Sequence, residues 1–247
     1  MSGFPYTEEL WHGYRRLNFR FEERDATVVL PHTPSPRGEW LLKAEYFNAF
    51  PDFELEMLER GFHLAYLQNI TRWHDARDDD AKARFCAFLT KELSLAPRCL
   101  PVGMSCGGML AVYFAAKYPH LVGALYLDAP VLNLLSCPCG VGRGIDRLYA
   151  EFTKHTGMTR ATLINYRNHP IDNLGPLLDH RIPVIIVAGD ADEVVPYEEN
   201  GAHLVAQYRA RGGDVTEIIK PGVGHHPHGL ADNTPLVAFA LQKYRIY

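Results

Sequence analysis

The chain has 247 residues, enough for one sizeable hydrophobic core, and α/β proteins of this length usually form a single domain. Hydrophobic residues make up 47% of the chain and charged residues 22%, which is ordinary for a globular protein and excludes long disordered or fibrous segments. The formal net charge of −4 arises from short mixed groups of acidic and basic residues, without the basic stripe typical of nucleic-acid-binding proteins. We therefore expect no nucleic-acid partner.

The N-terminal segment MSGFPYTEELWHGYRRL lacks the pattern of a signal peptide, and no apolar run approaches the roughly 18 residues of a membrane span. We expect a cytoplasmic protein without a membrane partner. The odd number of cysteines, five, favours reduced thiols. Cys137 and Cys139 could bind a metal or form a strained bridge, but a CxC pair lacks a second ligand pair at zinc spacing. We interpret them as small residues of a tight loop.

The first half of the chain alternates between strand and helix patterns. Residues 17–21 alternate apolar and polar side chains with period two, which is typical of a half-buried strand. Residues 32–38 are rich in turn formers and should form a loop. Strands are predicted for two segments within 17–31 and for 40–46, 62–68 and 98–102, and helices for 51–60, 81–93 and 106–118.

The second half continues this alternation, which implies an α/β fold with a mostly parallel sheet of about eight strands and helices on both faces. Residues 131–181 are less regular, and we interpret them as a small cap inserted over the carboxyl ends of the strands. There is no internal repeat, so we expect one domain over residues 1–247. Strands are predicted for 124–127, 184–187 and 215–219, and helices for 198–211 and 235–244.

The strongest local motif is Gly103-Met104-Ser105-Cys106-Gly107, a GxSxG sequence directly after a predicted strand and directly before a predicted helix. A serine in such a turn adopts a strained backbone conformation, so its flanking residues must be small for the chain segments to pass closely. The motif therefore predicts that Ser105 is exposed as a nucleophile.

The same turn places the serine at a helix N-terminus, where free backbone N–H groups stabilise developing negative charge. The N–H of Cys106 is the first expected oxyanion donor. We expect the second from the loop after the strand at 40–46, around Glu45 and Tyr46, although the familiar His-Gly dipeptide is missing there.

Two later strands are followed by residues that can complete a catalytic triad. GDADEVVP, with carboxylates at Asp190 and Asp192, follows one strand, and KPGVGHHPH, with His225 and His226, follows the next. Because parallel strands end at one edge of a sheet, a serine, an acid and a histidine should meet there, in the chain order serine, acid, histidine. A serine hydroxyl needs a histidine as general base and an acid to orient that histidine.

These three segments resemble the nucleophile elbow, acid loop and histidine loop of the α/β-hydrolase superfamily, over nearly the whole chain. The resemblance implies an α/β-hydrolase fold with Ser105 as nucleophile. In that superfamily the acid usually precedes two residues and a Val-Pro pair, which selects Asp192. The catalytic histidine usually follows a glycine directly, which selects His225.

Alternative roles are open for several neighbours. Asp190 could orient the histidine, but we interpret it as a loop residue that binds backbone amides. Asp128 occupies the position where some members of the superfamily keep their acid. The histidine run invites a metal interpretation. Neighbouring histidines on an irregular loop rarely point at one centre, so we expect no metal, and we interpret His226 and His228 as residues that hold the loop.

Trp73 and His74 follow a predicted strand and could bind substrate at the mouth of the pocket, with surface packing as the competing role. The histidine loop, Asp128-Ala129-Pro130 and Glu198-Glu199-Asn200 also resemble those of a bacterial group of esterases and prolyl-oligopeptidase-like hydrolases. This resemblance implies a small-molecule carboxylic ester as substrate, such as a carbohydrate-linked acyl or methyl ester.

A peptidase is less expected because the chain has no propeller beside the catalytic fold. The same triad would also serve a thioesterase or a haloperoxidase, and the fold could instead belong to a non-catalytic protein that binds a small ligand. We expect no cofactor, and helices flanking the sheet would allow a homodimer.

Overall fold

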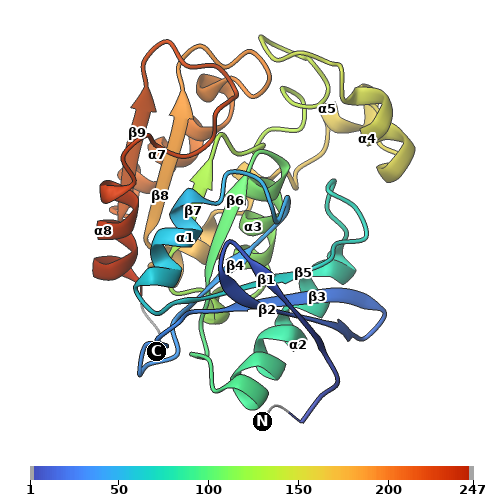
Figure 1. Ribbon diagram of the computed structural model, residues 1–247. Coiled ribbons are helices and arrows are strands. Elements are labelled where there is room, and N and C mark those ends of the chain that lie inside the picture. Colours follow the sequence, from blue (N-terminus) through green and yellow to red (C-terminus); the bar gives the residue numbers. More distant parts are fainter. Residues whose placement is uncertain (1–2, 245–247) are drawn as a thin grey trace.

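The computed structural model describes residues 3–244, so both ends of the predicted domain lie outside the described residues. One nine-stranded sheet, in the order β1-β2-β3-β5-β4-β6-β7-β8-β9, forms the centre of the fold (Figure 1). The first four strands in this order pair antiparallel, and every pair from β5–β4 onward is parallel. The strands are β1 (Thr7–Trp11), β2 (Tyr14–Phe21), β3 (Arg24–Leu30), β4 (Trp40–Lys43), β5 (His63–Leu67), β6 (Leu100–Met104), β7 (Leu125–Asp128), β8 (Val184–Gly189) and β9 (Val215–Lys220).

Helices cover both faces of the sheet, and each face has its own hydrophobic cluster. Side chains of α2, α3 and α7 belong to one cluster, and those of α1 and α8 belong to the other. Strands covered on both faces must be apolar throughout, and every residue of β6 and β8 is buried. The helices are α1 (Asp52–Glu59), α2 (Ala76–Leu93), α3 (Cys106–Lys117), α4 (Tyr149–Thr156), α5 (Arg160–Ile164), α6 (Gly175–Asp179), α7 (Gly201–Ala210) and α8 (Thr234–Lys243), with short 3-10 turns at Pro119–Leu121, Pro170–Asp172 and Tyr197–Glu199.

The predicted α/β-hydrolase fold is confirmed, with differences at individual elements. The sheet has one strand more than the expected eight within the described residues, because β1 was missed. Four of its five residues are exposed, so this edge strand carries no apolar alternation. The helix predicted for 198–211 is divided at Asn200, whose buried side chain accepts hydrogen bonds from the amides of Leu132 and Asn133, both at 2.9 Å.

A buried ion pair fixes the loop between β4 and α1. Lys43 at the end of β4 pairs with Glu54 of α1, and both side chains are almost fully buried. Lys43 Nζ also donates to the carbonyl of Ala49 at 3.2 Å and lies 3.6 Å from the sulfur of Met104. The loop is thereby held against the residue that precedes Ser105.

The segment between β7 and β8 carries α4, α5 and α6, and Figure 1 shows α4 and α5 beyond the ends toward which the parallel strands point. Glu151 of α4 accepts a hydrogen bond from Trp73 Nε1 at 2.9 Å and one from Arg72 Nε at 2.7 Å. The ring of Phe152, also on α4, packs edge-on against Trp73 with centroids 5.4 Å apart. These contacts tie the segment to the loop after β5.

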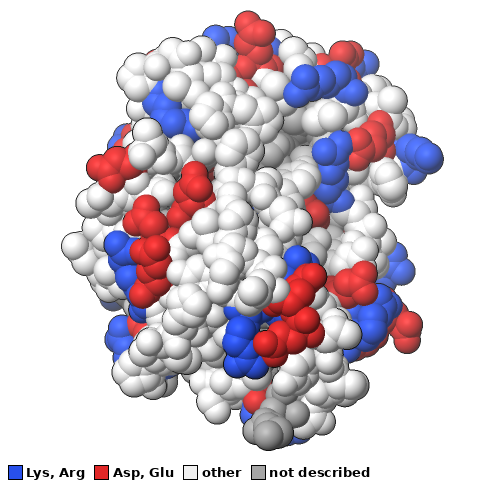
Figure 2. Space-filling view, in the orientation of Figure 1, with Lys and Arg blue, Asp and Glu red and all other residues white. Residues whose placement is uncertain are grey.

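The face shown in Figure 2 carries acidic and basic side chains in adjacent small groups, with pale uncharged surface between them. Among residues 3–244, no helix combines the length and the apolar character needed to cross a membrane.

Candidate active site

Ser105 forms a one-residue turn between β6 and α3, with φ 52° and ψ −119°. A Cβ atom at Gly103 would lie 2.5 Å from the carbonyl oxygen of Gly107, and one at Gly108 would lie 2.4 Å from Cβ of Pro130. Neither position has room for a side chain. The steric requirement inferred from the GxSxG motif is therefore strict at Gly103 and extends to Gly108 outside the motif, whereas a Cβ at Gly107 would lie 3.3 Å from Cβ of Glu45, a looser contact.

The structure brings the three predicted triad residues into one hydrogen-bonded chain. Nε2 of His225 lies 3.0 Å from Ser105 Oγ, and Nδ1 lies 2.7 Å from Asp192 Oδ2. An ionised carboxylate only accepts hydrogen bonds, so this contact keeps the ring proton on Nδ1 and directs the Nε2 lone pair to the serine.

Backbone amides hold the acid loop in place. The other oxygen of Asp192 accepts hydrogen bonds from the amides of Val194 and Val195, at 2.8 and 2.9 Å. Asp190 accepts one from the amide of Gly222 at 2.6 Å, so it ties the acid loop to the histidine loop, as expected of a residue that binds amides. The two neighbouring carboxylates therefore have different tasks, which spacing alone does not reveal.

Asp128 forms a second carboxylate–histidine pair, and its partner is His228 rather than His225. Oδ1 lies 2.6 Å from His228 Nδ1, while Oδ2 accepts hydrogen bonds from the Gly229 amide at 2.8 Å and from the Tyr126 hydroxyl at 3.1 Å. Both members of the pair are buried. His228 holds its loop as expected, and Asp128 supplies the anchor.

The triad opens into a cavity of about 250 Å³. Its wall comes from the loops after β4 and β5, the turn at Ser105, the two residues directly before α4, the acid loop and the histidine loop. Its lining residues are Tyr46, Ala49, Phe50, Arg72, Met104, Ser105, Arg147, Leu148, Val194, His225, His226 and His228.

Of the three residues expected at the oxyanion hole, Cys106, Tyr46 and Glu45, only Tyr46 lines the cavity with its side chain. Cys106 is the first residue of α3, and burial raises the pKa of its thiol to about 11, so the thiol stays neutral beside Ser105. Tyr46 lines the cavity, but its amide donates to the carboxylate of Glu45 at 3.2 Å. Glu45 also accepts from Asn69 Nδ2 at 2.6 Å and is absent from the cavity wall. Glu45 therefore positions the loop instead of facing a substrate.

Trp73 and His74 do not line the cavity of Ser105, which corrects their expected place at its mouth. Trp73 is buried beneath α4, and the ring of His74 stacks on Tyr113 with centroids 3.9 Å apart while Nε2 contacts Asp79 at 2.8 Å. They line a separate cavity of about 260 Å³. The residue of this segment that reaches the triad cavity is Arg72, and no sequence motif singled it out.

We expected the neighbouring histidines not to point at one centre, but the structure brings three of their rings together. The ligand nitrogens of His225, His226 and His228 all lie within 4.8 Å of one another. Phe50 supports this arrangement, because its ring stacks on His226 at 5.6 Å and meets His228 edge-on at 5.2 Å. The cysteines behave as predicted for reduced thiols, since all five are free and buried.

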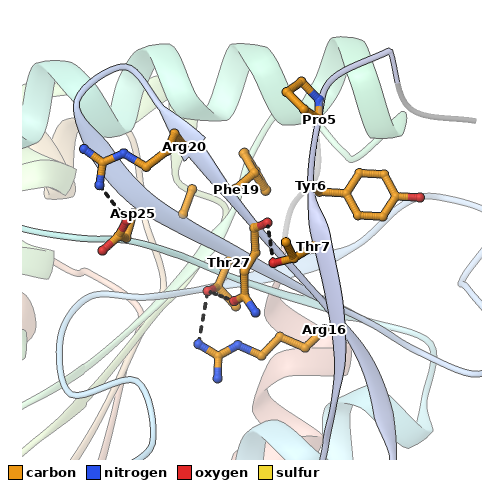
Figure 3. A pocket seen from close by; sticks show the side chains of 10 residues that line it. Pro5, Tyr6, Thr7, Arg16, Phe19, Arg20, Asp25 and Thr27 are labelled. Carbon is orange, nitrogen blue, oxygen red and sulfur yellow. Dashed lines mark hydrogen bonds and ion pairs between the residues drawn. The ribbon is translucent and has the colours of Figure 1, made fainter.

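A larger hollow of about 640 Å³ lies on the antiparallel ribbon of β1, β2 and β3, away from the triad (Figure 3). Its side chains are already paired: Arg20 with Asp25 at 2.5 Å, and Thr27 Oγ1 with Arg16 at 3.3 Å. The hollow contains none of the triad residues. We therefore regard the smaller cavity at Ser105 as the candidate active site.

A serine, a histidine and an aspartate joined at the C-terminal edge of a mostly parallel sheet define the α/β-hydrolase class of serine hydrolases. Residues 61–243 match the prolyl oligopeptidase family. The chain belongs to this family.

Solved structures of similar fold include two peptidases and an S-formylglutathione hydrolase. The Pyrococcus horikoshii acylaminoacyl peptidase has a TM-score of 0.67 and 14% identity, with 98% of this chain and 42% of that chain covered. The Porphyromonas gingivalis dipeptidyl peptidase 4 gives 0.65 and 14%, with 97% and 35% covered. An S-formylglutathione hydrolase from Agrobacterium tumefaciens gives 0.57 and 14%, with 89% and 91% covered. The chain thus spans well under half the length of the two peptidases.

The turn at Ser105 yields a prediction about stability. Gly103→Ala should lower the unfolding free energy by about 1–3 kcal/mol or more, because the new methyl meets backbone that cannot move aside. Gly3→Ala is the control, since its Cβ would meet only the end of the Glu92 side chain at 3.6 Å. The control should be neutral or slightly stabilising. Urea unfolding of both variants checks this, and equal stabilities would contradict the close approach at the turn.

Proposed function

We propose that this protein hydrolyses a small-molecule carboxylic ester through an acyl-enzyme intermediate. The observation that carries the proposal is the chain of hydrogen bonds from Asp192 through His225 to Ser105, which ends in an open cavity. The segment at residues 131–181 acts as a cap in this proposal, because Arg147 and Leu148 form part of the cavity wall.

In the proposed mechanism, Ser105 Oγ attacks the ester carbonyl while His225 Nε2 takes its proton. Asp192 stabilises the imidazolium that forms. His225 then gives the proton to the leaving alcohol, and an acyl-serine remains. Water then attacks the acyl carbonyl while the same Nε2 takes its proton, and His225 gives this proton to Ser105 Oγ as the acid leaves, which restores the serine hydroxyl.

The negative charge on the tetrahedral intermediate needs two donors. The amide of Cys106, at the N-terminus of α3, is one proposed donor. We assign the second to the hydroxyl of Tyr46 because the amide of Tyr46 is already engaged with Glu45. Arg72 Nη1 donates to this hydroxyl at 3.4 Å, so the phenol oxygen acts as acceptor toward Arg72 and its proton can be donated elsewhere. Cys106, whose thiol is a neighbour of this hydroxyl, follows Ser105 directly, so the proton is held on the side of the nucleophile. Burial raises the pKa of Tyr46 above its usual value, so the phenol keeps that proton at neutral pH.

The cavity of about 250 Å³ beside Ser105 accommodates a small acyl group, which supports an ester as substrate. A carbohydrate-linked ester is the specific case suggested by the sequence resemblance. Peptidase activity on the same triad is the second candidate, because the family match and two of the similar structures carry peptidase names.

A fluorophosphonate probe tests the proposed nucleophile. Wild-type protein should be labelled, and Ser105→Ala should not be. Folded wild-type protein that resists the probe would refute a serine hydrolase. Acetyl, feruloyl and methyl-uronate esters, a thioester and aminoacyl anilides then separate the candidate substrates. We expect turnover of an ester, and turnover of anilides alone would favour the peptidase.

Two aspartates of one loop test the acid assignment. Asp192→Asn should lower kcat by about 10⁴-fold, because the amide cannot hold His225 in the correct tautomer. Asp190→Asn is the control, since Asp190 contacts the amide of Gly222 and not the histidine. Steady-state kinetics on the best ester measure both variants. A larger loss in the Asp190 variant would reverse the assignment.

The Tyr46 hydroxyl is tested by Tyr46→Phe, which should reduce kcat by about 10²–10³-fold while KM changes little. Tyr66→Phe is a matched control because the Tyr66 hydroxyl contacts the same Glu45, at 3.4 Å, without lining the cavity. If the amide of Tyr46 were the donor instead, the two variants would have similar rates in a kinetic comparison.

A further inference from the structure

The histidine loop contains the parts of a transition-metal site as well as the proposed catalytic base. The rings of His225, His226 and His228 are nearly perpendicular to one another, with interplanar angles of 64° to 87° and centroids 4.8 to 5.0 Å apart. Their ligand nitrogens lie within 4.8 Å of each other on the wall of one cavity. Imidazole nitrogens are favoured ligands of Zn²⁺.

Two of the three rings are oriented in the way that metal-binding histidines usually are. His225 Nδ1 contacts Asp192 at 2.7 Å, and His228 Nδ1 contacts Asp128 at 2.6 Å. Both carboxylates are buried. A carboxylate on Nδ1 fixes the tautomer and makes Nε2 a stronger ligand, which is the usual outer arrangement of a zinc-bound histidine.

The third ring provides the adjustable ligand. His226 is exposed and packs on its neighbours in the loop and on Phe50. Zinc–nitrogen bonds are about 2.0–2.1 Å, so nitrogens on one tetrahedral ion are about 3.4 Å apart. The nitrogens lie within 4.8 Å of one another, so the most widely separated pair must approach by about 1 Å or more on binding. Of the three rings, that of the exposed His226 is the most free to move.

Local charge also favours a dication. Two buried carboxylates, Asp128 and Asp192, stand behind the rings. Two arginines line the cavity, but Arg72 is paired with Glu151, which leaves Arg147 as the opposing cation.

We propose that His225, His226 and His228 form an inhibitory site for Zn²⁺, in which the ion competes with Ser105 for Nε2 of His225. The inhibition rests on the proposed function, whereas the binding does not. The same lone pair cannot accept the serine proton and bind the metal. Bound zinc therefore prevents His225 from acting as the general base, and a chelator that removes the zinc restores this role.

Calorimetric titration with Zn²⁺ tests the binding without requiring activity. Wild-type protein should bind one ion, and Ser105→Ala should bind it at least as tightly because the competing hydroxyl is gone. His226→Ala removes a ligand and should weaken binding by at least about tenfold, and Asp128→Asn should weaken it by about 10–100-fold. His203→Ala, which removes an exposed histidine of α7, is the matched control and should bind like wild type.

Fluorophosphonate labelling with and without Zn²⁺ tests the inhibition. Each variant's labelling rate with Zn²⁺ is compared with its own rate without Zn²⁺. Zinc should slow labelling of the wild type and of the His203 variant. The His226 variant should need a much higher Zn²⁺ concentration for the same fractional slowing. No binding at millimolar Zn²⁺, or equal affinity of the wild type and the His226 variant, would overturn the metal site. Binding without slower labelling would overturn the competition. Absence of labelling in every sample would refute the proposed function alone, because calorimetry still decides the metal site.

Discussion

The chain must turn at Ser105 from the end of β6 into α3 within a single residue, at φ 52° and ψ −119°. That turn leaves no room for side chains at Gly103 or Gly108, because backbone or proline atoms would lie within 2.8 Å of a Cβ there. The amide of Ser105 donates to the carbonyl of Asp128 at 2.9 Å, which ties the turn to the neighbouring strand. The strain is thus balanced by close packing, and the hydroxyl is presented at the edge of the sheet.

Everything else at the site depends on where that edge lies. Because β6, β7, β8 and β9 run parallel, the loops that follow them open on the same side. Asp192 and His225 are 33 residues apart in the chain, and His225 and Ser105 are 120 apart, yet each pair is within hydrogen-bond distance. The short loops that carry Asp192 and His225 are held by hydrogen bonds from backbone amides, and these bonds fix the geometry of the triad.

Two carboxylate–histidine pairs lie side by side at this edge, and they differ in what the second nitrogen faces. In the pair of Asp192 and His225, Nε2 faces the serine. In the pair of Asp128 and His228, the carboxylate also accepts the Gly229 amide, and the ring lines the cavity. One loop therefore carries a catalytic candidate and a structural anchor of the same chemistry, and this closeness allows a single metal ion to act on the base.

The sequence by itself determined the fold class, the strand–turn–helix at Ser105, and the order of serine, acid and histidine, because periodicity, glycine requirements and strand ends are local properties. It missed β1, whose exposed residues leave no apolar pattern. Only the tertiary structure decided that Asp128 contacts His228, that Trp73 lies beneath α4 instead of in the cavity, and that Arg72 takes a place there. These outcomes depend on the path of loops between distant elements, where a shift of one residue changes the partner while the local pattern stays the same.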